Sequence, residues 1–332
     1  MSKSNCSALR NLRKTLCNSK EKAEIMKKNI KRLLSLAIVI ATITYIIQSD
    51  FFSGNTIKTI KSTEVHIWIA SIPLSITIFV LLGIQLKASL HPLLEKMKIK
   101  TAFHISASNT MLNYFPAKLG MFARGIYLKK NNNIAFIKYT EALISTSLVS
   151  TLVAIFFGLF AIAGNEHLIS LGSNLLAKLE HKTGTVAIAA LSATIIIMAI
   201  QKNDAIRKIW PYLKRGRILF LLLSTLAIFV ISSTRLYLCF LSLSYAPSVN
   251  EIIFIQSAIS LSFILSITPG NLGVKESVLV VAAACLLIDP QIALLAGLLD
   301  RLSALITTFA IGPFSSAFLL KSGQNNNSLE KK

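Results

Sequence analysis

Acidic residues are scarce in this sequence. Its 332 residues contain 14 aspartates and glutamates against 35 lysines and arginines, which gives a formal net charge of +21. Charged residues of both signs make up only 15% of the chain, whereas hydrophobic residues make up 53%. A soluble protein of this length needs more charged surface than that. The composition therefore excludes a soluble globular protein.

Cysteine and histidine are also few, and neither has a spacing typical of metal ligands. No CxxC pair occurs among the cysteines, and the histidines are scattered along the chain. These residues are Cys6, Cys17, Cys239 and Cys285, and His66, His91, His104, His167 and His181. We therefore expect no disulfide framework, no zinc or other metal site, and no cofactor.

The basic residues gather in short segments that flank apolar stretches. Ten of them lie in residues 1–32 and six more between Lys202 and Arg217. Nucleic-acid binding would be one reading of such a charge, but this placement is typical of the positive-inside pattern of membrane proteins. We expect a membrane surface as the partner of these segments, and no nucleic acid.

Long apolar runs dominate what remains, and several approach the roughly 20 residues that cross a bilayer as a helix. The sequence predicts an all-α polytopic membrane protein with about six full spans. These predicted spans are residues 33–48, 66–86, 139–163, 184–200, 218–243 and 291–319. Two further apolar segments are broken, so that about eight hydrophobic segments are expected.

The two broken segments are residues 101–128 and 251–288. Pro116 interrupts the first, and "TPGNLGVKE" (268–276) interrupts the second. Basic stretches lie both before and after 101–128, which favours a re-entrant hairpin. For 251–288, loop charge allows either a re-entrant hairpin or two full crossings. Because the backbone groups freed at a break cannot face lipid, we expect the second break to form the floor of a pocket near the midplane.

Loop charge also predicts the topology. The loops 87–100, 129–138 and 201–217 are basic and should be cytoplasmic, whereas 49–65, 165–183 and 244–250 should face outward. Both termini should then be cytoplasmic. We predict an integral protein of the bacterial inner membrane, with a basic arm over 1–32, a membrane domain over 33–320 and a polar tail over 321–332.

The two breaks share the spacing P-x-x-L-G, which begins at Pro116 and again at Pro269. Each follows two predicted spans and precedes one more, the first unit beginning inside and the second outside. This order is typical of an inverted-topology repeat, with repeats over 33–163 and 184–319. A chance match is the alternative, since three identities in five positions arise readily in an apolar chain.

Three stretches together resemble one family. "NYFPAKLGMFARGIYLKK" (113–130), "TPGNLGVKESVLV" (268–280) and "LLDRLSAL" (298–305) are similar to the lysylphosphatidylglycerol synthase transmembrane, or flippase-like, family. The resemblance covers roughly residues 33–320. The matching positions are Asn113, Pro116, Lys118, Gly120, Arg124, Pro269, Gly270, Leu272, Gly273, Glu276 and Arg301. Met121 departs from the family, whose members usually carry an acidic residue there, so no role of that carboxylate carries over.

The resemblance implies lipid handling rather than aminoacyl-transfer chemistry. In bifunctional members of the family, a separate soluble domain makes the aminoacyl lipid. This chain ends at Lys332, soon after its last predicted span, and we expect no such domain in it.

Charged residues inside predicted spans are the main candidates for a site. Each costs about 2.5–3.5 kcal/mol at a helix centre on insertion scales, and such residues are usually functional. Asp300 and Arg301 are adjacent and point about 100° apart on a helix, so each needs another partner. For Arg235, a phosphate clamp, a structural pairing with Asp300 or Glu276, and snorkelling to the outer interface are all open. The candidate substrate-binding residues are Asn113, Lys118, Arg124, Arg235, Asn271, Lys275, Glu276, Asp300 and Arg301, and the candidate break residues are Pro116, Gly120, Pro269, Gly270 and Gly273.

These features favour a transporter rather than an enzyme. The predicted function is transbilayer movement or binding of an anionic phospholipid or lipid-linked headgroup. Lys118, Arg124, Arg235 and Arg301 would hold phosphate, and Glu276 and Asp300 would fix those cations or carry a coupling proton. The alternatives are a membrane transferase that acts on a lipid phosphate carrier and a non-catalytic partner of a lipid-modifying envelope enzyme.

Overall fold

The computed structural model describes residues 63–91, 93–94, 97–115, 119–170, 215–263 and 269–329, and everything below concerns these residues. They contain helices and no strand. The helices are α3 (Val65–Ile69), α4 (Ser71–Leu90), α5 (Ile99–Leu112), α6 (Leu119–Asn132), α7 (Phe136–Ala163), α11 (Arg215–Leu241), α12 (Val249–Ser262), the 3-10 helix η4 (Pro269–Asn271), α13 (Val274–Cys285) and α14 (Pro290–Leu329). The protein is an all-α polytopic membrane protein, as the sequence predicts.

Four helical segments in the described part of the chain are long and apolar enough to cross a bilayer. They are Val65–Leu90, Phe136–Ala163, Ile218–Leu241 and Pro290–Lys321. These correspond to the predicted spans 66–86, 139–163, 218–243 and 291–319. The predicted spans 33–48 and 184–200 lie outside the described residues, as do the basic arm and the loop 201–214.

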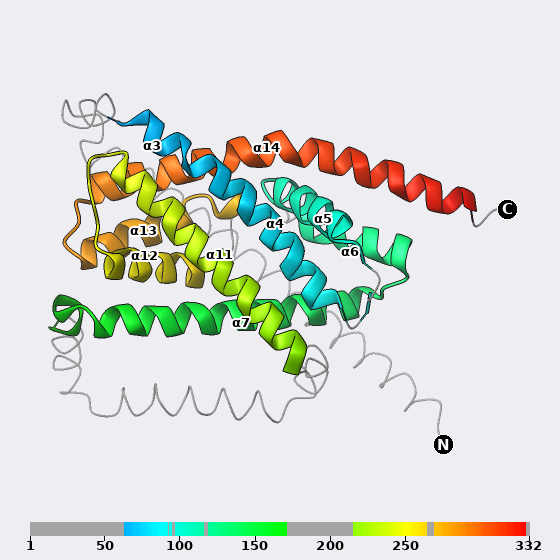
Figure 1. Ribbon diagram of the computed structural model, residues 1–332, viewed down its shortest axis with the longest axis horizontal. Helices are drawn as coiled ribbons and strands as arrows, with labels where there is room; N and C mark the ends of the chain where they lie inside the picture. The colour runs from blue at the N-terminus through cyan, green and yellow to red at the C-terminus, as the bar shows by residue number, and fades with distance from the viewer. Residues whose placement is uncertain are drawn as a thin grey trace, which may run out of the picture.

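Both broken segments fold as helical hairpins that stop inside the molecule. The arms α5, α6 and α12 have 14 residues each and α13 has 12. At 1.5 Å per residue, 14 residues reach about 21 Å, which is short of the roughly 30 Å of a hydrocarbon core. The α5–α6 hairpin enters from one end of the molecule and α12–α13 from the other (Figure 1). In the described residues neither hairpin has an arm long enough to cross the hydrocarbon core, which favours the re-entrant alternative for 251–288 over two full crossings.

The packing of the helices has a two-fold pattern. The pairs α4–α5, α5–α6, α6–α7 and α4–α7 of the first half have counterparts in α11–α12, α12–α13, α13–α14 and α11–α14 of the second. Across the halves, α5 packs on α14 as α12 packs on α7, and α4 packs on α11. In addition, α4 runs in the direction opposite to its counterpart α11, and α7 in the direction opposite to its counterpart α14 (Figure 1). Two copies of one unit inserted in opposite orientations would produce both features, the matching contacts across the halves and the opposed helix directions.

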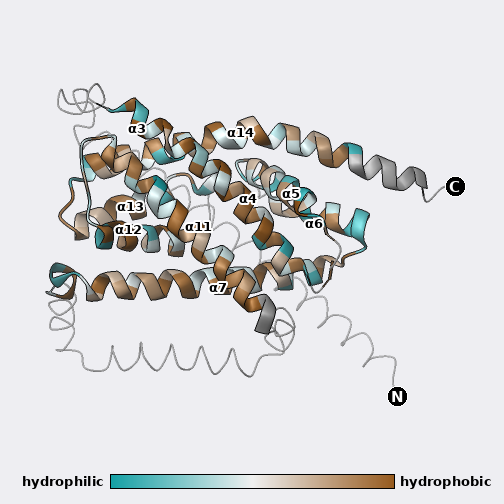
Figure 2. Cartoon of the chain, in the orientation of Figure 1, coloured by the Kyte–Doolittle hydropathy of each residue, from teal (hydrophilic) through white to brown (hydrophobic). Residues whose placement is uncertain are grey.

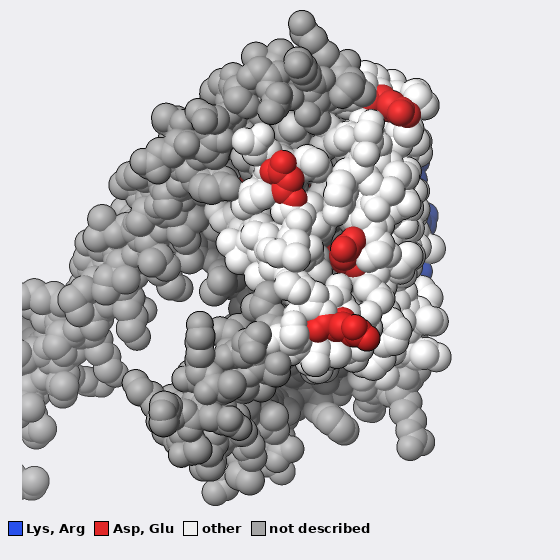
Figure 3. Space-filling view, turned by 90° about the vertical axis from the view of Figure 1, so that its left-hand side faces the viewer, with Lys and Arg blue, Asp and Glu red and all other residues white. Residues whose placement is uncertain are grey.

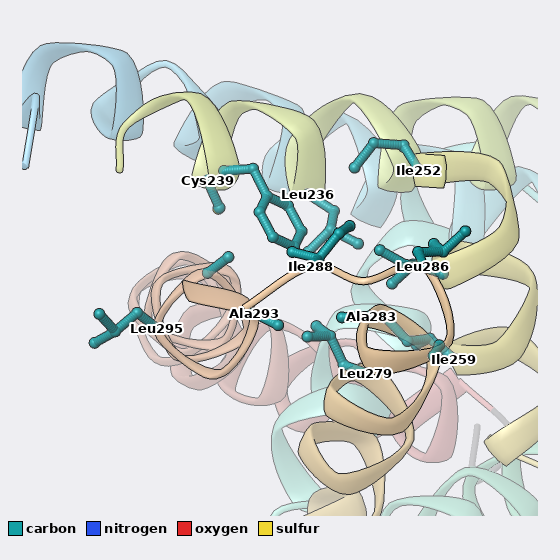
Figure 4. Close-up of a cluster of buried hydrophobic side chains, with 14 of the residues drawn as sticks. Leu236, Cys239, Ile252, Ile259, Leu279, Ala283, Leu286, Ile288, Ala293 and Leu295 are labelled. Atoms are coloured by element: carbon teal, nitrogen blue, oxygen red, sulfur yellow. The ribbon is translucent and has the colours of Figure 1, made fainter. Parts of the chain in front are cut away.

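Apolar side chains both fill the interior and cover the outside. The largest buried cluster of the described residues joins α11, α12, α13 and α14 and includes Phe240, Ile255 and Leu279 (Figure 4 shows side chains of this cluster). Apolar residues also run the length of α7 and α11 (Figure 2). On α7 they face outward, with Leu152 65% and Phe156 66% exposed. An apolar exterior of this kind suits a surface that lipid covers.

Candidate functional site

The second break meets the tip of the first hairpin. Gly270 has φ +59°, Asn271 +54° and Gly273 +80°, all in the left-handed region, which glycine adopts without steric cost. This turn carries the chain out of α12 and into α13. The backbone amide of Gly270 donates a hydrogen bond to the carbonyl oxygen of Asn113, 2.9 Å away, at the end of α5. The two hairpin tips are thus bonded to each other inside the molecule.

Glu276 links α13 to the break and to α14. Its Oε2 accepts a hydrogen bond from the Gly273 amide at 2.9 Å, which caps the N-terminus of α13. Its Oε1 lies 2.6 Å from Nη1 of Arg301. The other terminal nitrogen of Arg301, Nη2, donates to the carbonyl oxygen of Gly270 at 2.7 Å. Arg301 therefore binds the turn and the helix that follows it at the same time.

Asp300 is the centre of a second group of ion pairs. Arg235 of α11 donates to it through Nε at 2.6 Å and Nη2 at 3.1 Å, which is bidentate pairing. Lys275 of α13 donates to the same carboxylate. Arg235 also donates through Nη1 to Oγ of Ser75 on α4, 3.2 Å away. Asp300, which is 2% exposed, thus joins α11, α13 and α14, and Arg235 extends this group of contacts to α4.

We call these five charged residues the tip network: Arg235, Lys275, Glu276, Asp300 and Arg301. Their side chains are between 2% and 13% exposed. Three cations face two carboxylates, so the network carries one positive charge in excess. Removing a charge from water is costly unless an opposite charge balances it. Arg235 and Lys275 share the single carboxylate of Asp300, and no further carboxylate of the described residues pairs with either of them. The tip network is therefore suited to an anion.

The remaining candidate residues lie near the tip network, apart from it, or outside the described residues. Asn271 lies beside the tip network, 4% exposed, and neither polar atom of its amide has a hydrogen-bond partner. Asn113 takes part through its backbone carbonyl oxygen, which accepts the hydrogen bond from the Gly270 amide. Arg124 contacts none of the network and lies instead beside Tyr139, whose hydroxyl accepts from its Nε at 2.6 Å. Pro116 and Lys118 lie outside the described residues.

The break residues differ in how tightly they pack. A Cβ added to Gly120 would lie 2.1 Å from the Asn109 carbonyl oxygen, so only glycine lets α6 approach α5 this closely. A Cβ on Gly270 would lie 2.8 Å from Cδ1 of Tyr114. Pro269 opens the 3-10 turn η4, and Gly273 is the N-cap of α13.

Two cavities lie beside the first hairpin, away from the second break. A cavity of about 650 Å³ lies between α5, α6 and α14, and a smaller one of about 170 Å³ lies between α4, α5, α6 and α7. Neither is lined by residues of the second break. Asn271 and Val274 are each 4% exposed, so the break packs against its neighbours at these positions instead of forming the floor of either cavity.

Several residues of the site were missed by the sequence reasoning. Ser75 and Tyr114 contact the tip network or the break, while Asn109 and Tyr139 lie near Arg124. Serines and tyrosines in apolar helices usually bond to their own backbone or face the interface, so composition does not single them out. Tyr114 follows Asn113 at the end of α5. Its position two residues before Pro116 was the one feature of the sequence that could have indicated a role at the breaks.

Comparison with known proteins identifies one family. Residues 32–312 match the family described as the lysylphosphatidylglycerol synthase TM region. The chain belongs to this family. A UPF0104 membrane protein of Methanocaldococcus jannaschii is 23% identical over 322 residues, which cover 88% of this chain and 94% of that protein. A second UPF0104 membrane protein, from Methanothermobacter thermautotrophicus, is 30% identical over 94 residues, which cover 28% of this chain and 27% of that protein. No solved structure matches the chain.

Proposed function

We propose that the protein binds an anionic phospholipid or lipid-linked anionic headgroup and moves it across the bilayer. The observation that carries this proposal is the tip network, in which three buried charges and two largely buried ones add up to one positive charge in excess. It lies where a hairpin from each side of the molecule ends. A headgroup phosphate would supply the missing negative charge, and guanidinium groups bind phosphate well.

The position of the network supports movement as well as binding. Charges inside membrane proteins are costly and mark substrate pathways more often than structural contacts. In folds built from inverted repeats, substrate sites lie near the midplane, where discontinuous helices meet. The Gly270–Asn113 contact lies at such a meeting point. Asp300 and Glu276 hold the cations in place, and a headgroup phosphate competing for Arg235 or Arg301 would loosen the contacts between the hairpins.

Charge at the two ends of the molecule supports an orientation. Acidic side chains are spread over the end where α7 ends and α14 begins, and basic ones appear only at its edge (Figure 3). The opposite end carries the basic residues Lys87, Lys98, Lys129, Lys130 and Lys138. We propose that this basic end is cytoplasmic in a bacterial inner membrane, together with both termini. A lipid-modifying enzyme that supplies the lipid would be the natural partner.

Reconstitution tests the function. The full-length protein is placed in vesicles with a fluorescent phosphatidylglycerol, and transfer between leaflets is followed by chemical quenching of the outer leaflet. We expect transfer of this anionic lipid at a rate well above that of the matched phosphatidylcholine. Leaflet-specific labelling of lipids in a deletion strain provides the cellular readout. An unchanged leaflet distribution in that strain, together with no transfer in vesicles, would overturn the proposal.

A further inference from the structure

The cavity of about 650 Å³ beside the first hairpin contains a cation that the tip network does not use. Arg124 lines this cavity and also the smaller one next to it. Its Nε donates to the Tyr139 hydroxyl, and its guanidinium lies 5.3 Å from the centre of that ring. No carboxylate pairs with Arg124 within the part of the chain that the structure describes, and its Nη1 and Nη2 have no hydrogen-bond partner there.

The rest of the cavity wall is amphipathic. Lys130 lies six residues further along α6 and lines the same cavity, about 9 Å away along the helix axis. Asn109 lines it too, and its buried Oδ1 has no hydrogen-bond partner. Leu112 and Leu319 are among the apolar lining residues. One cavity thus offers two cations and an apolar wall.

The rim of this cavity is apolar and exposed. Ile126 and Leu320 both line the cavity and are 64% and 73% exposed. An apolar rim of this kind is open sideways to acyl chains, which distinguishes it from a pocket reached only through water. A lipid could therefore place its headgroup at Arg124 while its chains stay in the bilayer.

We infer that this cavity is a binding site for the phosphodiester of an anionic lipid, separate from the tip network and reached sideways from the bilayer. Arg124 binds the phosphate through its two terminal nitrogens, and Lys130 supplies a second positive charge. Tyr139 positions the guanidinium. The inference rests on the proposed function, within which this cavity is the site that takes up lipid at the basic end of the molecule.

Photo-crosslinking tests the site without requiring transport. Full-length protein in detergent is exposed to phosphatidylglycerol carrying a diazirine in one acyl chain, and crosslinked peptides are identified by mass spectrometry. We expect crosslinks in the peptides of α6 and α14 that contain Ile126 and Leu320. The same probe built on phosphatidylcholine should crosslink at least about tenfold less, since it adds no net negative charge.

Paired variants separate this site from a general effect of charge. Lys130→Gln should lower the crosslinking yield several-fold, and Arg124→Gln about tenfold or more, because charge-assisted bonds to phosphate are lost. Lys129→Gln removes the same charge from an exposed neighbour outside the cavity and should leave the yield unchanged. Likewise, Ile126→Trp should block the rim, whereas Phe122→Trp, also exposed but not part of the lining, should not.

The outcomes are distinct from those for the proposed function. Equal crosslinking of the two lipids, or no effect of Lys130→Gln and Arg124→Gln, would overturn the inference even if transport is observed. If crosslinking depends on Arg124 but the protein does not transport lipid, the binding site is supported and the proposed transport function is overturned. Complete competition by inorganic phosphate at the lipid's own concentration would show a site for free phosphate, which also overturns the inference.

Discussion

Gly270 and Asn113 are bonded backbone to backbone across the molecule. The Gly270 amide and the Asn113 carbonyl oxygen are 2.9 Å apart, although 157 residues separate them in the chain. Asn113 ends α5 and Gly270 lies in η4, just before α13, and the hairpins α5–α6 and α12–α13 enter from different sides (Figure 1). This bond and the Arg301 contact to the Gly270 carbonyl oxygen together hold the two hairpin tips against each other.

Gly270→Ala should weaken this junction. The new Cβ would lie 2.8 Å from the Tyr114 ring, and φ is +59°, a backbone conformation that costs a non-glycine residue about 1–2 kcal/mol. We expect a lower unfolding temperature in detergent and slower lipid transfer. Gly158→Ala is the matched control, because its Cβ would meet only the Ser257 side chain at 3.3 Å. A Gly270→Ala protein as stable and as active as this control would show that the turn tolerates a side chain.

Asp300→Asn should destabilise the protein strongly. Loss of this carboxylate leaves Arg235 and Lys275 buried without their partner, and breaking a buried ion pair typically costs about 3–5 kcal/mol. Thermal unfolding in detergent measures the effect. Glu166→Gln, which removes an exposed carboxylate, should change stability little. The double variant Asp300→Asn/Lys275→Met should recover part of the loss, and a simple sum of the two single effects would show that the pair is not coupled.

Arg235→Lys should reduce lipid transfer although it keeps the charge. Arg235 donates three hydrogen bonds, two to Asp300 and one to Ser75, and lysine cannot reproduce that fork. Loss of one bond to a charged group costs about 1.5–3 kcal/mol, and we expect at least a tenfold slower rate. Ser75→Ala removes only one of the three bonds and should have the smaller effect. A lysine variant with the wild-type rate would assign Arg235 a role in charge balance alone.

Cysteine labelling should report opposite sides for two exposed positions. Val249 begins α12 and is 73% exposed, while Ile137 lies at the start of α7 and is 71% exposed. With the native cysteines replaced by serine, Val249→Cys should react with an impermeant reagent in intact cells. Ile137→Cys should react only after permeabilisation. The reverse result would invert the proposed orientation, and labelling of both in intact cells would contradict the antiparallel arrangement of the hairpins.

Much of this protein is determined by its sequence alone. The apolar runs of about 20 residues require helices that cross a bilayer, because an unpaired backbone cannot face lipid. The same argument identifies the breaks at Pro116 and Pro269, since segments interrupted there are too short to span. The adjacent Asp300 and Arg301 point in different directions on α14, and the sequence predicts that each needs a partner elsewhere.

Only the tertiary structure decided which partners those are. Asp300 pairs with Arg235 and Lys275, while Arg301 pairs with Glu276. Arg124, which the sequence grouped with Arg235 and Arg301, belongs to a different cavity beside Tyr139. The physical reason is that helical periodicity sets the direction of a side chain from its own axis but not which helix lies opposite. That depends on how the two hairpins pack between the spans, and a contact between residues as far apart in the chain as Arg235 and Asp300 leaves no local trace in the sequence.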